Sequence, residues 1–251
     1  MFLWCNADNL NKIKEERKNM ASNKVKCGIE CLDLMFDGLM RGSSYIIAAG
    51  RGIGKTTFLL ATAKHFATLD KTLYITIEQN TYQLEPYLQQ NDNLAIYEMD
   101  KLDQWAEIEQ IIAQEQIKYV VFDYIGAILG DNDSTWLTLL NQANYIAEIA
   151  KKYNIIFVTA CQADDLLFQE FINNKDSSML FTGRYVSFSK HIVDKVAGAA
   201  YLIKDKDDNV YLYNFKNRYA MLQSQPIKVN NLDFNSKAWL SYARNHLERR
   251  W

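Results

Sequence analysis

Short apolar segments alternate along the chain with longer segments of helical periodicity. Five apolar segments rich in residues with β propensity predict buried strands. They are Tyr45–Ala49, Thr72–Ile77, Leu94–Tyr97, Tyr119–Asp123 and Ile155–Ala160. Their uninterrupted apolar character is typical of strands that are covered on both faces of a sheet.

Amphipathic helices are predicted between these strands, because apolar residues recur there at intervals of three and four. The predicted helices are Lys55–Leu69, Gln104–Ile117 and Ser134–Lys152. Alternation of strand, helix and strand predicts an α/β fold, with a mostly parallel, twisted sheet flanked by helices on both faces.

The pattern changes after residue 196. Three further strands are predicted there at Ala199–Ile203, Val210–Phe215 and Ile227–Val229, and short polar turns join them. Short turns connect antiparallel strands, whereas parallel strands need long crossovers. We therefore expect an antiparallel C-terminal extension of the same sheet.

The sequence indicates one domain between two tails. It has two prolines and lacks a Gly/Ser-rich linker or a low-complexity tract. The predicted domain covers residues 25–235, with an N-terminal tail at 1–24 and a C-terminal helical tail at 236–251. Both tails are charged and prone to form helices, so they are candidates for docking on a partner or on a neighbouring subunit.

Composition narrows the class of protein. Apolar residues make up 49% and charged residues 23% of the chain, which is typical of a globular protein. The net charge of -2 argues against attraction of nucleic acid to the whole surface, so any nucleic acid would bind to a local basic strip. Four cysteines without a C-x-x-C pair are typical of free thiols in a reducing cytosol. No apolar segment has the length of a membrane span. We expect a cytoplasmic protein without a membrane partner.

One segment carries the strongest chemical signal. It consists of Ala49, Gly50, Arg51, Gly52, Ile53, Gly54, Lys55, Thr56 and Thr57, between a predicted strand and a predicted helix. Glycines in this setting let backbone N–H groups surround a phosphate at the positive end of the helix. Lys55 is expected to contact the β- and γ-phosphates, and the Thr56 hydroxyl to bind Mg²⁺. The segment therefore predicts a site for a nucleoside triphosphate, although alanine occupies its first glycine position.

Polar residues also follow three other predicted strands. Asp123 ends an apolar strand at the edge where open α/β sheets bind ligands, so it is expected to hold Mg²⁺ through water. Glu78 can orient and deprotonate an attacking water, and Gln162 can sense the γ-phosphate. Each residue alone also fits an ordinary strand end. Their convergence on one crevice favours the catalytic interpretation.

These features resemble the RecA-like ATPase domain of hexameric replicative helicases of the DnaB type, over residues 25–235. The resemblance rests on the lead-in from Gly28 to Gly42, the P-loop, Glu78, Asp123-Tyr124, Gln162 and the late strand Tyr213–Arg218. It implies a RecA-like core that binds ATP and Mg²⁺ and acts on single-stranded DNA. It also implies a homo-oligomer, either a hexameric ring or a filament.

Individual roles follow from the same resemblance. Glu78 matches the catalytic carboxylate, and Gln162 matches the residue that couples hydrolysis to a DNA-binding loop. Lys216 and Arg218 match the pair that reaches the neighbouring subunit's ATP, with Arg218 as the arginine finger. An arginine finger supplied by a neighbouring subunit raises the rate of hydrolysis by about 10³–10⁵-fold. A surface charge on an edge strand is the alternative interpretation of Arg218.

The sequence departs from the DnaB pattern in three places. About 25 residues precede the core, and residues 219–224 replace a glycine/proline turn after the finger. Residues 163–190 include acidic and aromatic side chains where a DNA-facing loop is basic. The candidate phosphate contacts in and near this loop are Lys175, Arg184, Lys190, His191 and Lys195, which also fit a solvated charged face.

The sequence is compatible with three functions. The first is an ATP-dependent, oligomeric DnaB-like helicase or translocase on single-stranded DNA in replication, with a replication or loader protein as a candidate partner. The second is a RecA/RadA-like recombination ATPase. The third is a helicase-like adaptor switched by nucleotide without unwinding. Asp123-Tyr124 and Cys161-Gln162 favour the helicase interpretation over the recombinase.

Overall fold

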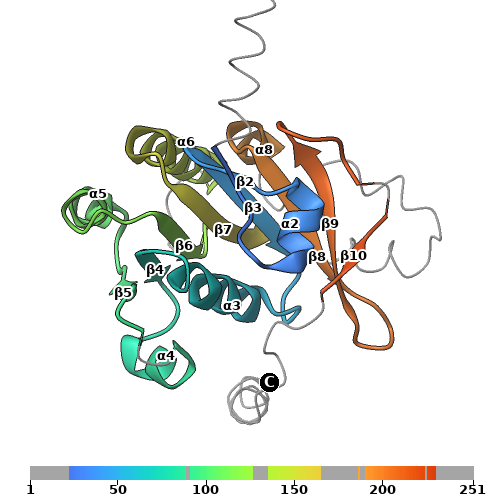
Figure 1. The fold of residues 1–251 in the computed structure, drawn as a ribbon, viewed down its shortest axis with the longest axis horizontal. Helices are drawn as coiled ribbons and strands as arrows, with labels where there is room; N and C mark the ends of the chain where they lie inside the picture. The colour runs from blue at the N-terminus through green and yellow to red at the C-terminus, as the bar shows by residue number, and fades with distance from the viewer. Residues whose placement is uncertain are drawn as a thin grey trace, which may run out of the picture.

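A mixed sheet of eight strands organises the part of the chain that the computed structural model describes, which is residues 23–88, 91–126, 135–164, 186, 190–223 and 225–229. The strand order is β10-β9-β8-β3-β7-β6-β4-β5 (Figure 1). The strands are β3 (Ser43–Ala49), β4 (Thr72–Thr76), β5 (Leu94–Glu98), β6 (Tyr119–Asp123), β7 (Ile156–Gln162), β8 (Gly198–Lys204), β9 (Val210–Asn217) and β10 (Ile227–Lys228). A separate two-stranded sheet pairs β1 (Lys24–Val25) with β2 (Leu39–Met40).

Helices cover both faces of the large sheet, as the sequence predicts. They are α2 (Glu30–Phe36), α3 (Lys55–Ala67), α4 (Thr81–Leu88), α5 (Trp105–Gln114), α6 (Thr135–Tyr153) and α8 (Lys190–Lys195), with a 3-10 turn η1 (Leu102–Gln104) before α5. The predicted tails at 1–24 and 236–251 lie outside the described residues except for positions 23 and 24.

The predicted division of the sheet is confirmed. Strands β8, β3, β7, β6, β4 and β5 pair in parallel, whereas β9 pairs antiparallel with β8 and with β10. The six parallel strands need crossover connections, whereas the five-residue turn between β8 and β9, residues 205–209, joins antiparallel strands directly. The antiparallel strands thus extend one edge of a parallel core.

Alternation along the strands separates the two cores. In β3, Ile46 and Ala48 pack with α5, α6 and α8, whereas Tyr45, Ile47 and Ala49 pack with α2 and α3. Successive side chains of a strand point to opposite faces, so an apolar residue is needed at every position of a strand covered twice. This explains why the strand segments read as continuous apolar runs.

Three short helices, α2, α4 and α8, were not predicted, because they carry too few turns to show a period. Hydrogen bonds within the chain hold the turn that precedes α2. The Asp33 carboxylate accepts them from the backbone N–H groups of Cys27 and Gly28, at 2.8 Å each. Gly28 has a φ of +79, and a Cβ there would lie 2.5 Å from His65 Nε2 on α3. Glycine is therefore favoured at this contact between α3 and the turn that precedes α2.

One acidic side chain ties α5 to α6. Glu109 accepts hydrogen bonds from Lys152 Nζ at 2.6 Å, Tyr145 Oη at 3.0 Å and Tyr153 Oη at 3.0 Å. The bond from Lys152, followed by those from the two tyrosines, lowers the pKa of Glu109 below its ordinary value despite partial burial. The ionised form is therefore favoured by folding.

We expect Glu109→Gln to lower the free energy of unfolding at pH 7 by about 1 kcal/mol, the net worth of a partly exposed charged hydrogen bond. The deficit should shrink as the pH falls below 4.5, because a carboxyl with a depressed pKa loses its stabilising effect on protonation. Urea unfolding at pH 7 and pH 3.5 measures this. Glu115→Gln, which removes an exposed pair with Lys71, is the matched control, and equal losses at both pH values would contradict the prediction.

Candidate nucleotide site

Four strands end at the same edge of the sheet. The parallel register pairs Ala49, the last residue of β3, with Gln162, the last residue of β7. On the other side of β7, the end of β6 at Asp123 pairs with Thr76 at the end of β4. The polar residues predicted to converge therefore leave the sheet at one edge, next to the loop that follows β3.

This loop turns directly into α3. Gly54 is the N-cap of the helix with a φ of +108, and Gly52 has a φ of +72, both in the left-handed region that favours glycine. Lys55 Nζ donates to the carbonyl oxygens of Ala49 at 3.2 Å and Gly50 at 3.0 Å. The lysine thus lies folded over the loop, with its charge inside the concavity.

Asp123 carries a buried carboxyl group in the crevice. It is 2% exposed, and its Oδ2 accepts a 3.0 Å hydrogen bond from the Tyr74 hydroxyl. Its Oδ1 has no hydrogen-bond partner among the described residues. Burial raises the pKa of Asp123 to about 6, while the Thr56 and Tyr74 hydroxyls act in the opposite direction and Glu78 adds a smaller upward push.

These groups fit a magnesium ion. Mg²⁺ prefers oxygen ligands, and Asp123 Oδ1 is a buried oxygen without a partner beside the Thr56 hydroxyl. The two residues come from the end of β6 and the first turn of α3, which are held together by the sheet. No cluster of three or more His, Cys, Asp or Glu side chains that could hold a metal by themselves occurs in the described part of the chain. The donor set thus matches an ion that is shared with phosphate oxygens.

Glu78 is held near the crevice by the turn that ends β4. Gln79 N donates to Thr76 Oγ1 at 3.2 Å, and Ile77 N donates to the Asp123 carbonyl at 3.2 Å. Tyr124, joined to Asp123 by a cis peptide bond, places its ring 5.7 Å from Lys55 Nζ. Burial and the neighbouring Glu78 carboxylate raise the pKa of Tyr124 to about 12. Glu78, Tyr124 and Lys55 therefore face one another.

Electrostatics inside the crevice balance one cation against two carboxylates. Burial lowers the pKa of Lys55, and the carboxylates of Asp123 and Glu78 oppose that effect. The half-buried Gln162 lies beside the loop, because Ala163 N donates to the Ala49 carbonyl at 2.9 Å. Of the residues predicted at the site, Lys55, Thr56, Glu78, Asp123 and Gln162 are brought together.

Lys216 and Arg218, which were also predicted at the site, lie away from this crevice. Asn217 pairs with Gly198 and, through β8, aligns with Tyr45, four residues before the end of β3. The two cations are thus about 13 Å further along the strands than Ala49, toward the opposite edge of the sheet. Lys216 Nζ donates to the carbonyl oxygen of Val193, and Arg218 Nη2 to that of Asp194, so both contact the C-terminal turn of α8. They are too far from their own P-loop to reach a phosphate there.

Sequence reasoning missed the role of Tyr74. Its fully buried side chain looks like core, yet its hydroxyl contacts Asp123. The signal was available, because Tyr74 precedes Thr76 by two residues on the same face of β4, and Thr76 pairs with Asp123. Of the candidate DNA contacts, Lys175 and Arg184 and the side chains of Lys190 and His191 lie outside the described residues. Lys195 is exposed at the end of α8.

We expect Asp123→Asn to stabilise the nucleotide-free protein at pH 8 by about 2 kcal/mol, because the buried carboxylate is costly to ionise. A raised carboxyl pKa means that stability is present at low pH and lost as the pH rises from 3.8 to about 6, so the advantage should vanish near pH 4. Urea unfolding across this range measures it. Asp103→Asn, at an exposed position, is the control. A variant less stable than wild type at pH 8 would overturn the assignment of a strained carboxylate.

Solved structures with similar folds cover most of this chain. A DnaB-like replicative helicase, solved in a study of its interactions with primase, has a TM-score of 0.67 at 15% identity, over 88% of this chain and 64% of that one. A solved ATPase domain has a TM-score of 0.66 at 16% identity, over 86% and 92%. A KaiC-like protein of Pyrococcus horikoshii has a TM-score of 0.62 at 16% identity, over 82% and 93%. At these identities, the similarity establishes the fold.

Curated relatives match about half of the chain. The DNA repair protein RadA of Rickettsia conorii is 34% identical over 134 residues, 49% of this chain and 30% of that protein. RadA of Aquifex aeolicus is 28% identical over 137 residues, 51% of this chain and 30% of that protein. No family model matches the sequence. Among the described helices, none combines the length and apolar character needed to cross a bilayer. The chain has a RecA-like P-loop ATPase fold and resembles the ATPase domains of DnaB-like helicases.

Proposed function

We propose that this chain is an Mg²⁺-dependent ATPase whose catalytic site is shared between two copies, and that it works as a DnaB-like helicase or translocase on single-stranded DNA in replication. The ATPase unit spans residues 25–235. The observation that carries the proposal is the separation of its polar residues. Lys55, Thr56, Asp123 and Glu78 occupy one edge of the sheet, and Arg218 lies toward the other.

The phosphate edge has the groups that hydrolysis requires. Backbone N–H groups of residues 50–54 and the start of α3 bind the β-phosphate, and Lys55 moves from the loop carbonyls to the phosphate oxygens. Thr56 and Asp123 hold Mg²⁺, which when bound offsets charge on the phosphates. Glu78 orients a water molecule and accepts its proton as the water oxygen attacks the γ-phosphorus, while the bond from the γ-phosphorus to the β,γ-bridging oxygen breaks and ADP leaves. Gln162, beside the loop, contacts the γ-phosphate.

The opposite edge of the sheet has an arginine that can serve a second copy. Charge that develops on the γ-phosphoryl group is stabilised by an arginine in many P-loop enzymes. Among the described residues, Arg51 is the arginine closest in sequence to the crevice, and it extends from the exposed loop itself. Arg218 cannot reach its own site, so it serves the site of the next copy, with Lys216 beside it. Head-to-tail contacts of this kind build a ring or a filament.

Similarity to known proteins supports DNA as the substrate of the motor. The fold is that of a DnaB-like replicative helicase, and the sequence relatives are named as DNA repair proteins. Single-stranded DNA is bound mainly through its phosphates, so its binding should weaken with salt. We place this activity in the cytoplasm, with a replication or loader protein as a candidate partner.

A RecA/RadA-like recombination ATPase is the second candidate. The sequence match to RadA, 34% identity over 134 residues, favours it. Both candidates share the nucleotide site and the trans-acting Arg218, and they differ in what the assembly does to DNA. Unwinding of a forked duplex indicates the first, and filament formation with strand exchange indicates the second.

We expect single-stranded DNA to stimulate ATP hydrolysis, and both Lys55→Ala and Arg218→Ala to lower the turnover number by about 10³-fold or more. Lys55→Ala removes the phosphate contact, whereas Arg218→Ala removes a group that acts on the neighbour. Mixing the two variants should therefore restore part of the activity, because some interfaces pair an intact crevice with an intact Arg218. Steady-state phosphate release measures all three effects.

Arg218→Lys is the matched variant, since it keeps the charge and loses the planar fork. Nucleotide binding should survive in Arg218→Ala and fail in Lys55→Ala, which separates binding from turnover. If hydrolysis is slow, is not stimulated by DNA and is unchanged in Arg218→Ala, the proposed helicase or translocase function is refuted. A nucleotide-switched adaptor would then be the better account.

A further inference from the structure

Tyr74 carries a hydroxyl group next to the carboxylate that is proposed to serve Mg²⁺. Its side chain is fully buried, and its Oη donates a 3.0 Å hydrogen bond to Asp123 Oδ2. The strand register explains this contact. Tyr74 pairs with Val121 between β4 and β6, so Asp123 is its diagonal neighbour on the same face of the sheet. A diagonal neighbour lies within reach of an aromatic side chain.

The ring of Tyr74 is held in the core between the sheet and α3. It belongs to the same apolar cluster as Val121 and Phe58, whereas the hydroxyl at its tip reaches the polar crevice. Close packing leaves a buried ring few alternative rotamers, so the core fixes the position of the hydroxyl. A fixed donor in turn fixes the orientation of the carboxylate that accepts its hydrogen bond.

The two oxygens of Asp123 are therefore not equivalent. Oδ2 is bonded to Tyr74, whereas Oδ1 is buried without a hydrogen-bond partner among the described residues. The Thr56 hydroxyl, in the first turn of α3, lies beside the same carboxyl group. One oxygen of Asp123 thus remains for a ligand in the crevice.

We propose that Tyr74 is a positioning residue that makes Asp123 a ligand with a single free oxygen, and that it thereby selects Mg²⁺ over Ca²⁺. The proposal rests on the Mg²⁺-dependent nucleotide site of the proposed function. Mg²⁺ requires near-octahedral coordination and keeps several water molecules, so one carboxylate oxygen that faces the ion or one of these waters suffices. Ca²⁺ accepts more ligands in looser geometries, including both oxygens of one carboxylate.

A role in packing alone is the alternative interpretation of Tyr74. Packing requires only the ring, which Tyr74→Phe keeps while it removes the hydroxyl. The loss of this donor frees Asp123 Oδ2 and lets the carboxylate turn. A change in the preference between the two ions therefore separates positioning from packing.

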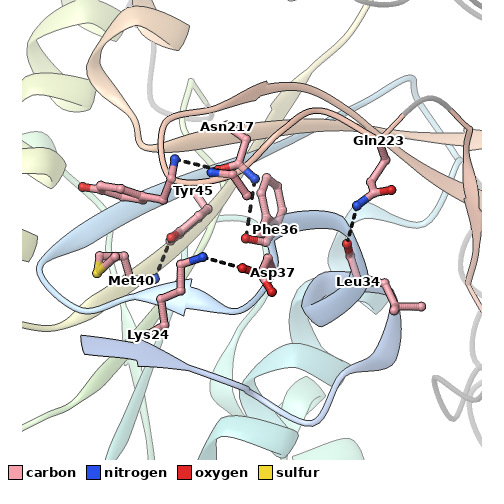
Figure 2. Close-up of polar contacts among 10 residues, drawn as sticks. Lys24, Leu34, Phe36, Asp37, Met40, Tyr45, Asn217 and Gln223 are labelled. Atoms are coloured by element: carbon pink, nitrogen blue, oxygen red, sulfur yellow. Dashed lines mark hydrogen bonds and ion pairs between the residues drawn. The ribbon is translucent and has the colours of Figure 1, made fainter. Parts of the chain in front are cut away.

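Tyr45→Phe is the matched control. Tyr45 is 2% exposed in the same apolar cluster, and through β7 and β6 it is level with Tyr74 across the sheet. Its hydroxyl accepts a 2.7 Å hydrogen bond from the backbone N–H of Met40 on β2 (Figure 2). The control thus removes a buried tyrosine hydroxyl of the same core that does not contact Asp123.

The test measures binding of a fluorescent, non-hydrolysable ATP analogue while Mg²⁺ or Ca²⁺ is titrated into metal-free protein. We expect wild type and Tyr45→Phe to share one Mg²⁺ midpoint, at a lower concentration than their Ca²⁺ midpoint. Tyr74→Phe should raise the Mg²⁺ midpoint by about tenfold, as does the loss of a group that orients a metal ligand, and the Ca²⁺ midpoint by less. Analogue binding in EDTA should be unchanged, which shows that the variant is folded.

A double variant tests whether the effect passes through the carboxylate. In an Asp123→Ala background, Tyr74→Phe should not shift the Mg²⁺ midpoint any further, because the group that it positions is gone. An additional shift of the same size as in wild type would refute the positioning role.

The remaining outcomes separate this proposal from the proposed function. If Mg²⁺ promotes analogue binding to wild type and Tyr74→Phe has the same midpoint, the positioning role is refuted while the proposed function stands. Equal Mg²⁺ and Ca²⁺ midpoints in wild type would refute the selectivity, even if Tyr74→Phe did not fold. If neither ion changes analogue binding to wild type, the Mg²⁺-dependent site and the role of Tyr74 fail together.

Discussion

Parallel pairing of β3 with β7 and of β6 with β4 is the constraint on which the site depends. Ala49 is level with Gln162, and Asp123 is level with Thr76, so a loop, an acid, a glutamine and the turn to Glu78 leave the sheet together. A slip of one residue in β6 would turn Asp123 from the crevice into the opposite face of the sheet. The apolar packing on both faces, which forbids such a slip, therefore also fixes the chemistry.

The same packing makes the free site electrostatically unfavourable. Asp123 is nearly inaccessible to water, with one oxygen bonded to Tyr74 and the other without a described partner. Lys55 is bonded to the carbonyls of its own loop instead of an anion. Under the proposed function, phosphate supplies the anion for Lys55 and Mg²⁺ supplies a partner for Asp123. Part of the affinity for nucleotide would then come from polar groups that the free protein leaves poorly satisfied, a common pattern in functional sites.

The sequence predicts this fold well where strands are buried on both faces. The predicted strand Tyr119–Asp123 is the same as β6, and the helices α3 and α6 lie within two residues of their predicted ends. The short helices α2, α4 and α8 were not predicted, because they carry too few turns to show a period. In addition, α2 and the turn before it depend on contacts with distant residues, Asn214 and His65. The convergence of Glu78, Asp123 and Gln162 was predictable because parallel strands share an edge. The contact of Tyr74 with Asp123 was also open to prediction, because Tyr74 lies two residues before Thr76 on the same face of β4.

One stretch of chain links the two edges of the molecule. It leaves β7 at Gln162, beside the P-loop, and returns in α8, whose last carbonyls receive hydrogen bonds from Lys216 and Arg218. If a neighbour's phosphate draws those cations away, Val193 and Asp194 lose these donors while Gln162 responds to the chain's own phosphate. Both ends of the stretch are then biased by nucleotide, one by the copy's own ATP and one by that of its neighbour. Under the proposed function, Gln162 therefore depends on the copy's own nucleotide, whereas the carbonyl oxygens of Val193 and Asp194 depend on the nucleotide of its neighbour.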